Sequence, residues 1–328
     1  MCRSRMQVCA ARIVPIALIS ILAAAVSSAL SPDQRLLALV PPGSQVVAGI
    51  AASHVGGQPD SFLLITHNNA VDLQDFFTLT GSDASRSIHQ VIFTAAADRA
   101  GNLTEHSLLA SGHFDRARIF QSAGSEGANL SQYRGVPVLV VAPFERERGT
   151  FNDMRGLVVI DSDVVLFGTL ITVQQELDRH MDRSPSDSSI VERLSRMRGN
   201  DETWCLLAAS GHGDEIQNAL RQLDPTLAGM VENGGAFQFG IRYGVHIEFE
   251  YEISAASLAN AQDVSESLAI SLGGAIPNAS LFLRQPGINQ NVDMIHGVVK
   301  VTRQRYEAWL AGLSANRPHE SVLLHLAK

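Results

Sequence analysis

Cysteine is scarce in this chain, and its positions exclude a disulfide framework. The 328 residues contain three cysteines, and two of them, Cys2 and Cys9, precede the first long apolar run. If that segment is removed, Cys205 alone remains, and one cysteine cannot close an internal disulfide. Cys205 lies within Trp204–Leu207, an apolar run that predicts a buried strand and a structural thiol. The fold must therefore depend on its hydrophobic core.

Motifs for nucleotides, metals and nucleophilic catalysis are also missing. There is neither a Walker loop nor a Gly-x-Gly-x-x-Gly pattern, so we expect no nucleotide cofactor. His246-Ile247-Glu248 has the His-x-Glu spacing of zinc deaminases but lacks their Pro-Cys-x-x-Cys partner. Ala209–Gly213 lacks the glycines of a nucleophile elbow. We therefore expect no cofactor and no dedicated metal site.

Two acidic segments are interpreted as structural. His246, Glu248, Glu250 and Glu252 share one face of a predicted strand, which favours a solvated outer sheet face over loose binding of a divalent cation. Asp161-Ser162-Asp163 lies between two apolar runs and lacks the glutamate of a calcium loop, so it predicts a hairpin turn.

Acidic residues outnumber basic residues, which argues against polyanionic partners. The formal net charge is −8, and removal of residues 1–29 takes away three arginines and no acidic residue, which leaves −11. An acidic surface repels nucleic acids and anionic lipids. We expect no nucleic-acid partner, and membrane contact only through the N-terminal segment.

That segment is the most informative part of the sequence. Arg3, Arg5 and Arg12 precede an apolar run over residues 13–30 that ends in small residues, the pattern of a secretory signal peptide. Ser27 and Ala29 suit signal peptidase, so residues 1–29 are predicted to be cleaved. The alternative is an uncleaved anchor formed by residues 13–30. Either reading places the body in the periplasm or outside the cell.

The rest of the chain mixes strand and helix patterns. Apolar and polar residues alternate in 237–241 and 245–253, as in half-buried antiparallel strands, and helices are predicted near 171–180 and 189–198. The predicted fold class is α+β, with antiparallel sheets and helices packed on one face. Two similar halves, residues 30–199 and 200–328, are expected.

The two alternating strands predict a specific hairpin. A three-residue loop, Arg242–Gly244, places Ile241 opposite Val245 and Phe239 opposite Ile247, so both faces agree along the ladder. That loop requires a left-handed residue, which Gly244 would supply.

A short internal repetition supports the idea of two halves. Leu108–Asp115 is echoed by Leu206–Asp214, and each contains a glycine-histidine pair before a capping aspartate. The histidines, His113 and His212, would occupy matching positions near helix N-termini, where anions are favoured. They are therefore candidate ligand-binding residues, and the alternative is that both are ordinary turn residues.

The pattern resembles uncharacterised exported bacterial proteins with a signal peptide and two α+β halves. The resemblance rests on Leu39–Gly43, Ser111–Asp115 and Tyr133–Val136, which are structural turns spread over most of the predicted mature chain. It implies a fold and no activity.

These observations favour a non-enzymatic exported protein that binds a protein or small-molecule ligand. The alternative is an extracytoplasmic hydrolase whose site is assembled from distant residues. His, Asp and Ser together in one deep pocket would favour the hydrolase.

Overall fold

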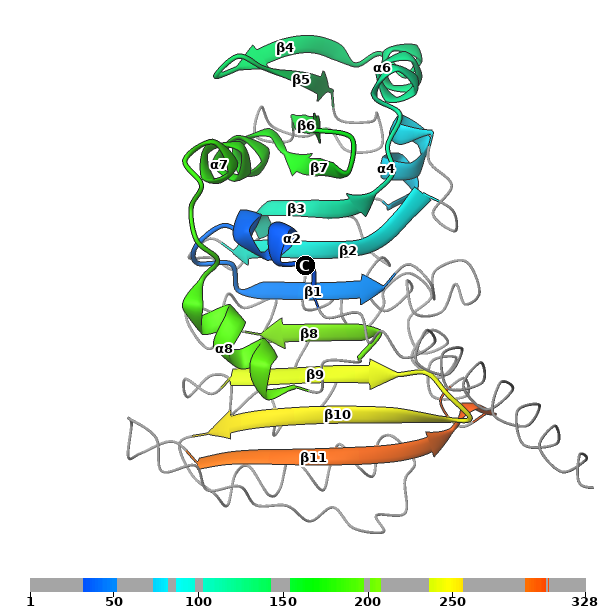
Figure 1. Ribbon diagram of the computed structural model, residues 1–328, viewed down its shortest axis with the longest axis vertical. Helices are drawn as coiled ribbons and strands as arrows, with labels where there is room; N and C mark the ends of the chain where they lie inside the picture. The colour runs from blue at the N-terminus through cyan, green and yellow to red at the C-terminus, as the bar shows by residue number, and fades with distance from the viewer. Residues whose placement is uncertain are drawn as a thin grey trace, which may run out of the picture.

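Antiparallel strands form one continuous sheet in the computed structural model (Figure 1). The structure describes residues 32–51, 73–81, 87–97, 103–142, 154–197, 201–207, 236–255, 293–304 and 306. Within these residues the sheet has 11 strands in the order β11-β10-β9-β8-β1-β2-β3-β7-β6-β5-β4. No helix in the described part of the chain has the length and apolar character needed to cross a bilayer. The predicted signal segment lies outside these residues.

The strands follow the apolar runs of the sequence. Their bounds are β1 Val46–Ala51, β2 Ile88–Ala97, β3 Leu103–Gly112, β4 Asn129–Tyr133, β5 Val136–Val141, β6 Arg155–Ile160, β7 Val164–Thr169, β8 Thr203–Leu207, β9 Ala236–Arg242, β10 His246–Ala255 and β11 Asp293–Thr302. β1 is buried along its whole length and pairs with both β2 and β8. The sheet therefore passes without a break across the expected boundary near residue 200.

The described helices cover both faces of the sheet. They are α2 Gln34–Leu39, α4 Leu73–Thr80, α6 Arg116–Ser125, α7 Leu170–Met181 and α8 Ser188–Arg196. Apolar residues of α2, α7 and α8 pack with Val47 and Leu109, whereas those of α4 and α6 pack with the neighbouring Ala48 and Leu108. Since neighbouring strand residues point to opposite faces, these are two separate apolar layers. The α+β class and the antiparallel sheet are confirmed, but the helices are divided between the faces instead of lying on one.

Two tight turns agree with the sequence. Arg134 and Gly135, with φ of 49° and 84°, join β4 to β5 in a two-residue turn of the kind that fits the strand twist. The predicted hairpin at Asp161–Asp163 is also confirmed, because Ile160 pairs with Val164.

The register predicted for the β9–β10 hairpin is wrong. The apolar residues of the two strands nevertheless share one face, as predicted. Ile241 pairs with Phe249 instead of Val245, and Arg242 pairs with Glu248. Gly244 does not adopt a positive φ. The observed register stacks the rings of Phe239 and Phe249, whose centroids are 5.2 Å apart, and forms an ion pair between Arg242 and Glu248. These contacts favour a wider loop over a tight turn.

The centre of the sheet yields a test of packing. Gly49 pairs with Trp204, and a Cβ at position 49 would lie 2.2 Å from the indole Cε2. We expect Gly49→Ala to lower the free energy of unfolding by about 1–3 kcal/mol, because the buried ring must move. Gly124→Ala is the control, since a Cβ there meets no atom within 4 Å. Urea unfolding of both variants measures the difference, and equal stabilities would contradict this packing.

Candidate functional site

An open pocket lies where α2, the β6–β7 hairpin and the end of α7 meet. Its volume is about 620 Å³. Its charged lining consists of Arg35, Asp161, Asp163, Arg179, His180 and Arg183. The remaining lining residues are Ala38, Leu39, Ile160, Val164, Met181 and Ser184. The pocket therefore combines an apolar wall with a cationic rim, in which three arginines exceed two aspartates.

The α2 side of the pocket is fixed by ion pairs. Asp33 caps α2 by accepting a hydrogen bond from the Arg35 N–H at 3.0 Å. The Arg35 guanidinium binds both carboxylate oxygens of Asp33 and also pairs with Asp163. Burial acts to raise the pKa of Asp33, but the hydrogen bonds from Arg35 outweigh it and hold that pKa below its usual value. The charge of Arg35 is thus compensated by carboxylates of the protein itself.

The α7 side of the pocket ends in a Schellman motif. The Arg183 N–H donates to the His180 carbonyl at 3.2 Å, and the Ser184 N–H donates to the Arg179 carbonyl at 2.9 Å. The residue between the helix and Ser184 must be left-handed, and this position usually holds glycine. Here it is Arg183, with a φ of 50°. A non-glycine residue in this conformation costs about 1 kcal/mol or more.

Arg179 joins the two sides of the pocket without using a carboxylate. Its Nε donates to the Ala38 carbonyl at 2.9 Å, and its Nη2 donates to the Pro185 carbonyl at 2.6 Å. Neither Arg179 nor Arg183 forms an ion pair with any described residue. Within the described part of the chain these two guanidinium groups therefore have no directly paired carboxylate, although the charge of Arg179 helps to lower the pKa of Asp187.

A buried carboxyl group holds α7 against the sheet. Glu176 is fully buried and accepts a hydrogen bond from the Ser107 hydroxyl, which in turn lies 2.8 Å from the Thr94 hydroxyl. Burial raises the pKa of Glu176 well above its usual value, against the smaller opposing effect of the Ser107 hydrogen bond. Burial therefore favours the neutral form of this carboxyl group, because a charge at this depth would lose its hydration.

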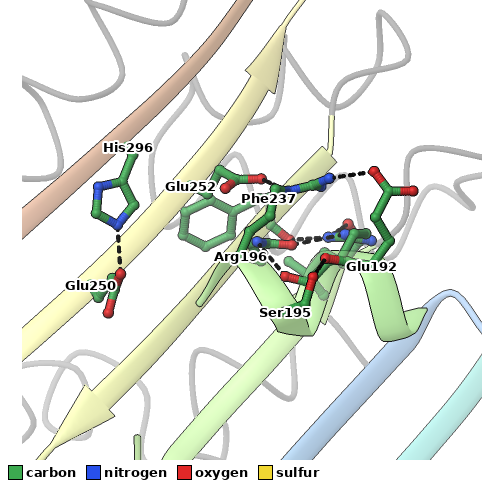
Figure 2. Close-up of polar contacts among 10 residues, drawn as sticks. Glu192, Ser195, Arg196, Phe237, Glu250, Glu252 and His296 are labelled. Atoms are coloured by element: carbon green, nitrogen blue, oxygen red, sulfur yellow. Dashed lines mark hydrogen bonds and ion pairs between the residues drawn. The ribbon is translucent and has the colours of Figure 1, made fainter. Parts of the chain in front are cut away.

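A second polar cluster connects α8 to β9 and β10 (Figure 2). Arg193 donates to the carbonyls of Leu207 and Phe237, each at 2.9 Å, and burial lowers its pKa to about 10. Arg196 pairs with Glu252 at 2.8 Å and with Glu192 at 2.9 Å. These contacts hold α8 on the sheet. Ile190 is the only side chain of this helix that is buried among the described residues.

The acidic face of β10 is not the solvated outer face that the sequence predicted. Glu250 and Glu252 are only 4% and 8% exposed. Glu250 lies 2.5 Å from the Nε2 atom of His296, and Glu248 pairs with Lys300 at 2.7 Å. These carboxylates have protein partners, and no group of three or more His, Cys, Asp or Glu residues in the described ranges could hold a metal ion.

Of the two histidines predicted from the sequence, only His113 lies in the described part of the chain. His113 is exposed between β3 and α6, and Asp115 caps α6 as expected. His212 lies outside the described residues, as does most of the second echo. The pocket residues were not predicted, because residues 182–188 have the serine, proline and aspartate content of a linker. Arg179 and His180, at the end of the predicted 171–180 helix, were the sequence feature that could have indicated the pocket.

Comparisons with known proteins give the chain no family. No family model matches it, and no curated protein matches it either. Among solved structures, crystal form I of TP0453 is similar, with a TM-score of 0.47 and 13% sequence identity. The similarity covers 86% of this chain and 98% of the TP0453 chain.

Glu176 generates a pH-dependent prediction. Its pKa is raised on folding, so its contribution to stability is complete below about pH 4 and is lost as the pH rises through the folded-state pKa. We expect Glu176→Gln to gain stability relative to the wild-type protein between about pH 4 and pH 8. Urea unfolding across this range measures the difference, with the exposed Glu126→Gln as the control. A constant difference between the wild-type protein and Glu176→Gln would show that Glu176 does not titrate in this range.

Proposed function

We propose that this protein is an exported, non-catalytic binding protein whose pocket takes a small ligand with an anionic group joined to an apolar part. The anionic group, a carboxylate or a phosphate, would contact Arg179 and Arg183. The apolar part would lie along Leu39, Ile160 and Val164. Guanidinium groups suit both anions, because their planar N–H donors match two oxygens at once.

The observation that carries the proposal is the left-handed Arg183. Glycine would end α7 without the conformational cost, yet an arginine stands at this position and lines the pocket. Strained residues of this kind are concentrated at functional sites. Its guanidinium has no hydrogen bond or ion pair with any described residue, so its donors are available to a ligand.

Local charge also supports an anionic ligand. Arg35 is paired with Asp33 and Asp163, whereas Arg179 and Arg183 form no ion pair with a described residue, and Arg179 acts on Asp187 only at longer range. The protein as a whole is acidic, so long-range attraction does not bring an anion to this pocket. Affinity must then come from direct contacts, and the apolar wall would add the burial of a hydrocarbon segment.

The decisive variant is Arg183→Gly, tested with octanoate and octyl phosphate as probes and with octanol as the uncharged control. We expect each anion to bind the wild-type protein. Each should bind Arg183→Gly about tenfold more weakly, which is the loss expected for one charge-assisted contact. The unfolding free energy should stay equal or rise by about 1 kcal/mol, because glycine adopts this conformation freely. Titration calorimetry and urea unfolding measure the two effects.

A matched control separates the pocket from general charge. Arg116 is exposed on α6, where its guanidinium stacks on Phe120, 5.4 Å from the ring centroid. Arg116→Ala removes the same charge and should leave anion binding unchanged. Equal binding by the wild-type protein and Arg183→Gly, or equal losses in Arg183→Gly and Arg116→Ala, would contradict the proposal.

The hydrolase alternative has one observation in its favour. Ser184, His180 and Asp161 all line the pocket. However, no hydrogen bond joins the side chains of these three residues, and a catalytic serine requires a base within hydrogen-bond reach. Binding is therefore the better-supported function. Hydrolysis of p-nitrophenyl octanoate that disappears in Ser184→Ala would reverse this preference.

A further inference from the structure

A pair of exposed histidines forms a second candidate site outside the pocket. His89 in β2 and His113 after β3 lie edge to face, with ring centroids 5.0 Å apart and an angle of 82° between the planes. Both side chains are exposed. No ring nitrogen of either residue makes a hydrogen bond to a described residue.

Backbone irregularities place these two rings together. In the β2–β3 ladder, Ile88 pairs with Gly112 and Gln90 pairs with Ser111, so His89 is the extra residue of a β-bulge. Bulges redirect a side chain and are frequent beside functional sites. The bulge therefore explains why His89 is turned out of the regular ladder.

Gly112 provides the matching feature on the other strand. A Cβ at this position would lie 2.0 Å from the Ser87 carbonyl oxygen, so only glycine permits this approach of the two chains. The same carbonyl accepts a hydrogen bond from the His113 N–H at 2.6 Å. The glycine-histidine pair noted in the sequence thus brings His113 next to His89.

We propose that His89 and His113 form a two-histidine site for a divalent transition-metal ion such as Ni²⁺ or Zn²⁺. Neutral imidazole is a preferred ligand of these ions. A tetrahedral ion with bonds of about 2.0–2.1 Å to nitrogen would hold two imidazole centroids roughly 5 Å apart. The two rings now lie edge to face, and they are close enough to reach one ion once rotation of the exposed side chains directs one nitrogen of each ring at it. Water would complete the coordination, so the site binds reversibly.

Calorimetric titration of the untagged protein with NiCl₂ and ZnCl₂ tests the proposal. We expect one ion per chain at this site, and a loss of at least about tenfold in affinity in both His89→Ala and His113→Ala. Removal of a residue that only hydrogen-bonds to a metal ligand already lowers metal affinity by about 10–100-fold, so removal of a ligand should cost at least as much. MgCl₂ should not bind there, because Mg²⁺ prefers oxygen ligands. His246→Ala is the control, since His246 is exposed on β10.

The outcomes decide the proposal in either direction. Absence of binding at millimolar metal, unchanged affinity in the His89 and His113 variants, or a loss in His246→Ala alone would overturn it. Thermal unfolding checks that each variant is folded. If His89→Ala is unfolded, His89→Asn retains a polar side chain at the bulge and is expected to show the same loss of metal affinity.

Discussion

β1 pairs with β2 on one side and β8 on the other, and the rest of the structure depends on this double pairing. Every residue of β1 is buried, and successive residues supply the two apolar layers of the molecule. α2 is connected to β1 by only a few residues, so the position of β1 determines that of α2. α7, which packs on β3, β6 and β7, is then brought beside α2. The pocket forms between these two helices as a consequence of the sheet.

Polar groups complete the positions that apolar packing leaves open. The buried Glu176 holds α7 on the sheet, and Arg179 connects the end of α7 to α2. Arg193 and Arg196 hold α8 on β9 and β10 in the same manner. Buried polar groups of this kind are costly unless they are hydrogen-bonded, and their partners therefore define one geometry. Arg183 differs from all of them, because it has no such partner among the described residues, and this is why we propose it as a ligand-binding residue.

Local patterns in the sequence predicted those elements that local chemistry determines. The Asp161–Asp163 turn and the cap at Asp115 follow from nearby residues, and both are confirmed. The β9–β10 register was wrong because contacts with β11, Glu202 and Tyr306 influence that loop, and these are distant in sequence. β4 was missed because it is an exposed polar edge strand, without the apolar alternation that marks a half-buried one.

The candidate sites were harder to predict than the fold. The pocket draws on three separated segments, and its key residue lies in a stretch whose serine, proline and aspartate content resembles a linker. His113 was identified, but His89 was not, because a bulge arises from the pairing of two strands and has no signature in either one. The proposed ligand site depends most on Arg183 and Arg179. NMR spectra of the arginine Nε–Hε groups during titration with octyl phosphate test it most directly. Saturable shifts of Arg179 and Arg183, with Arg116 and Arg193 unchanged, are predicted, whereas no shift, or equal shifts of all arginines, would contradict it.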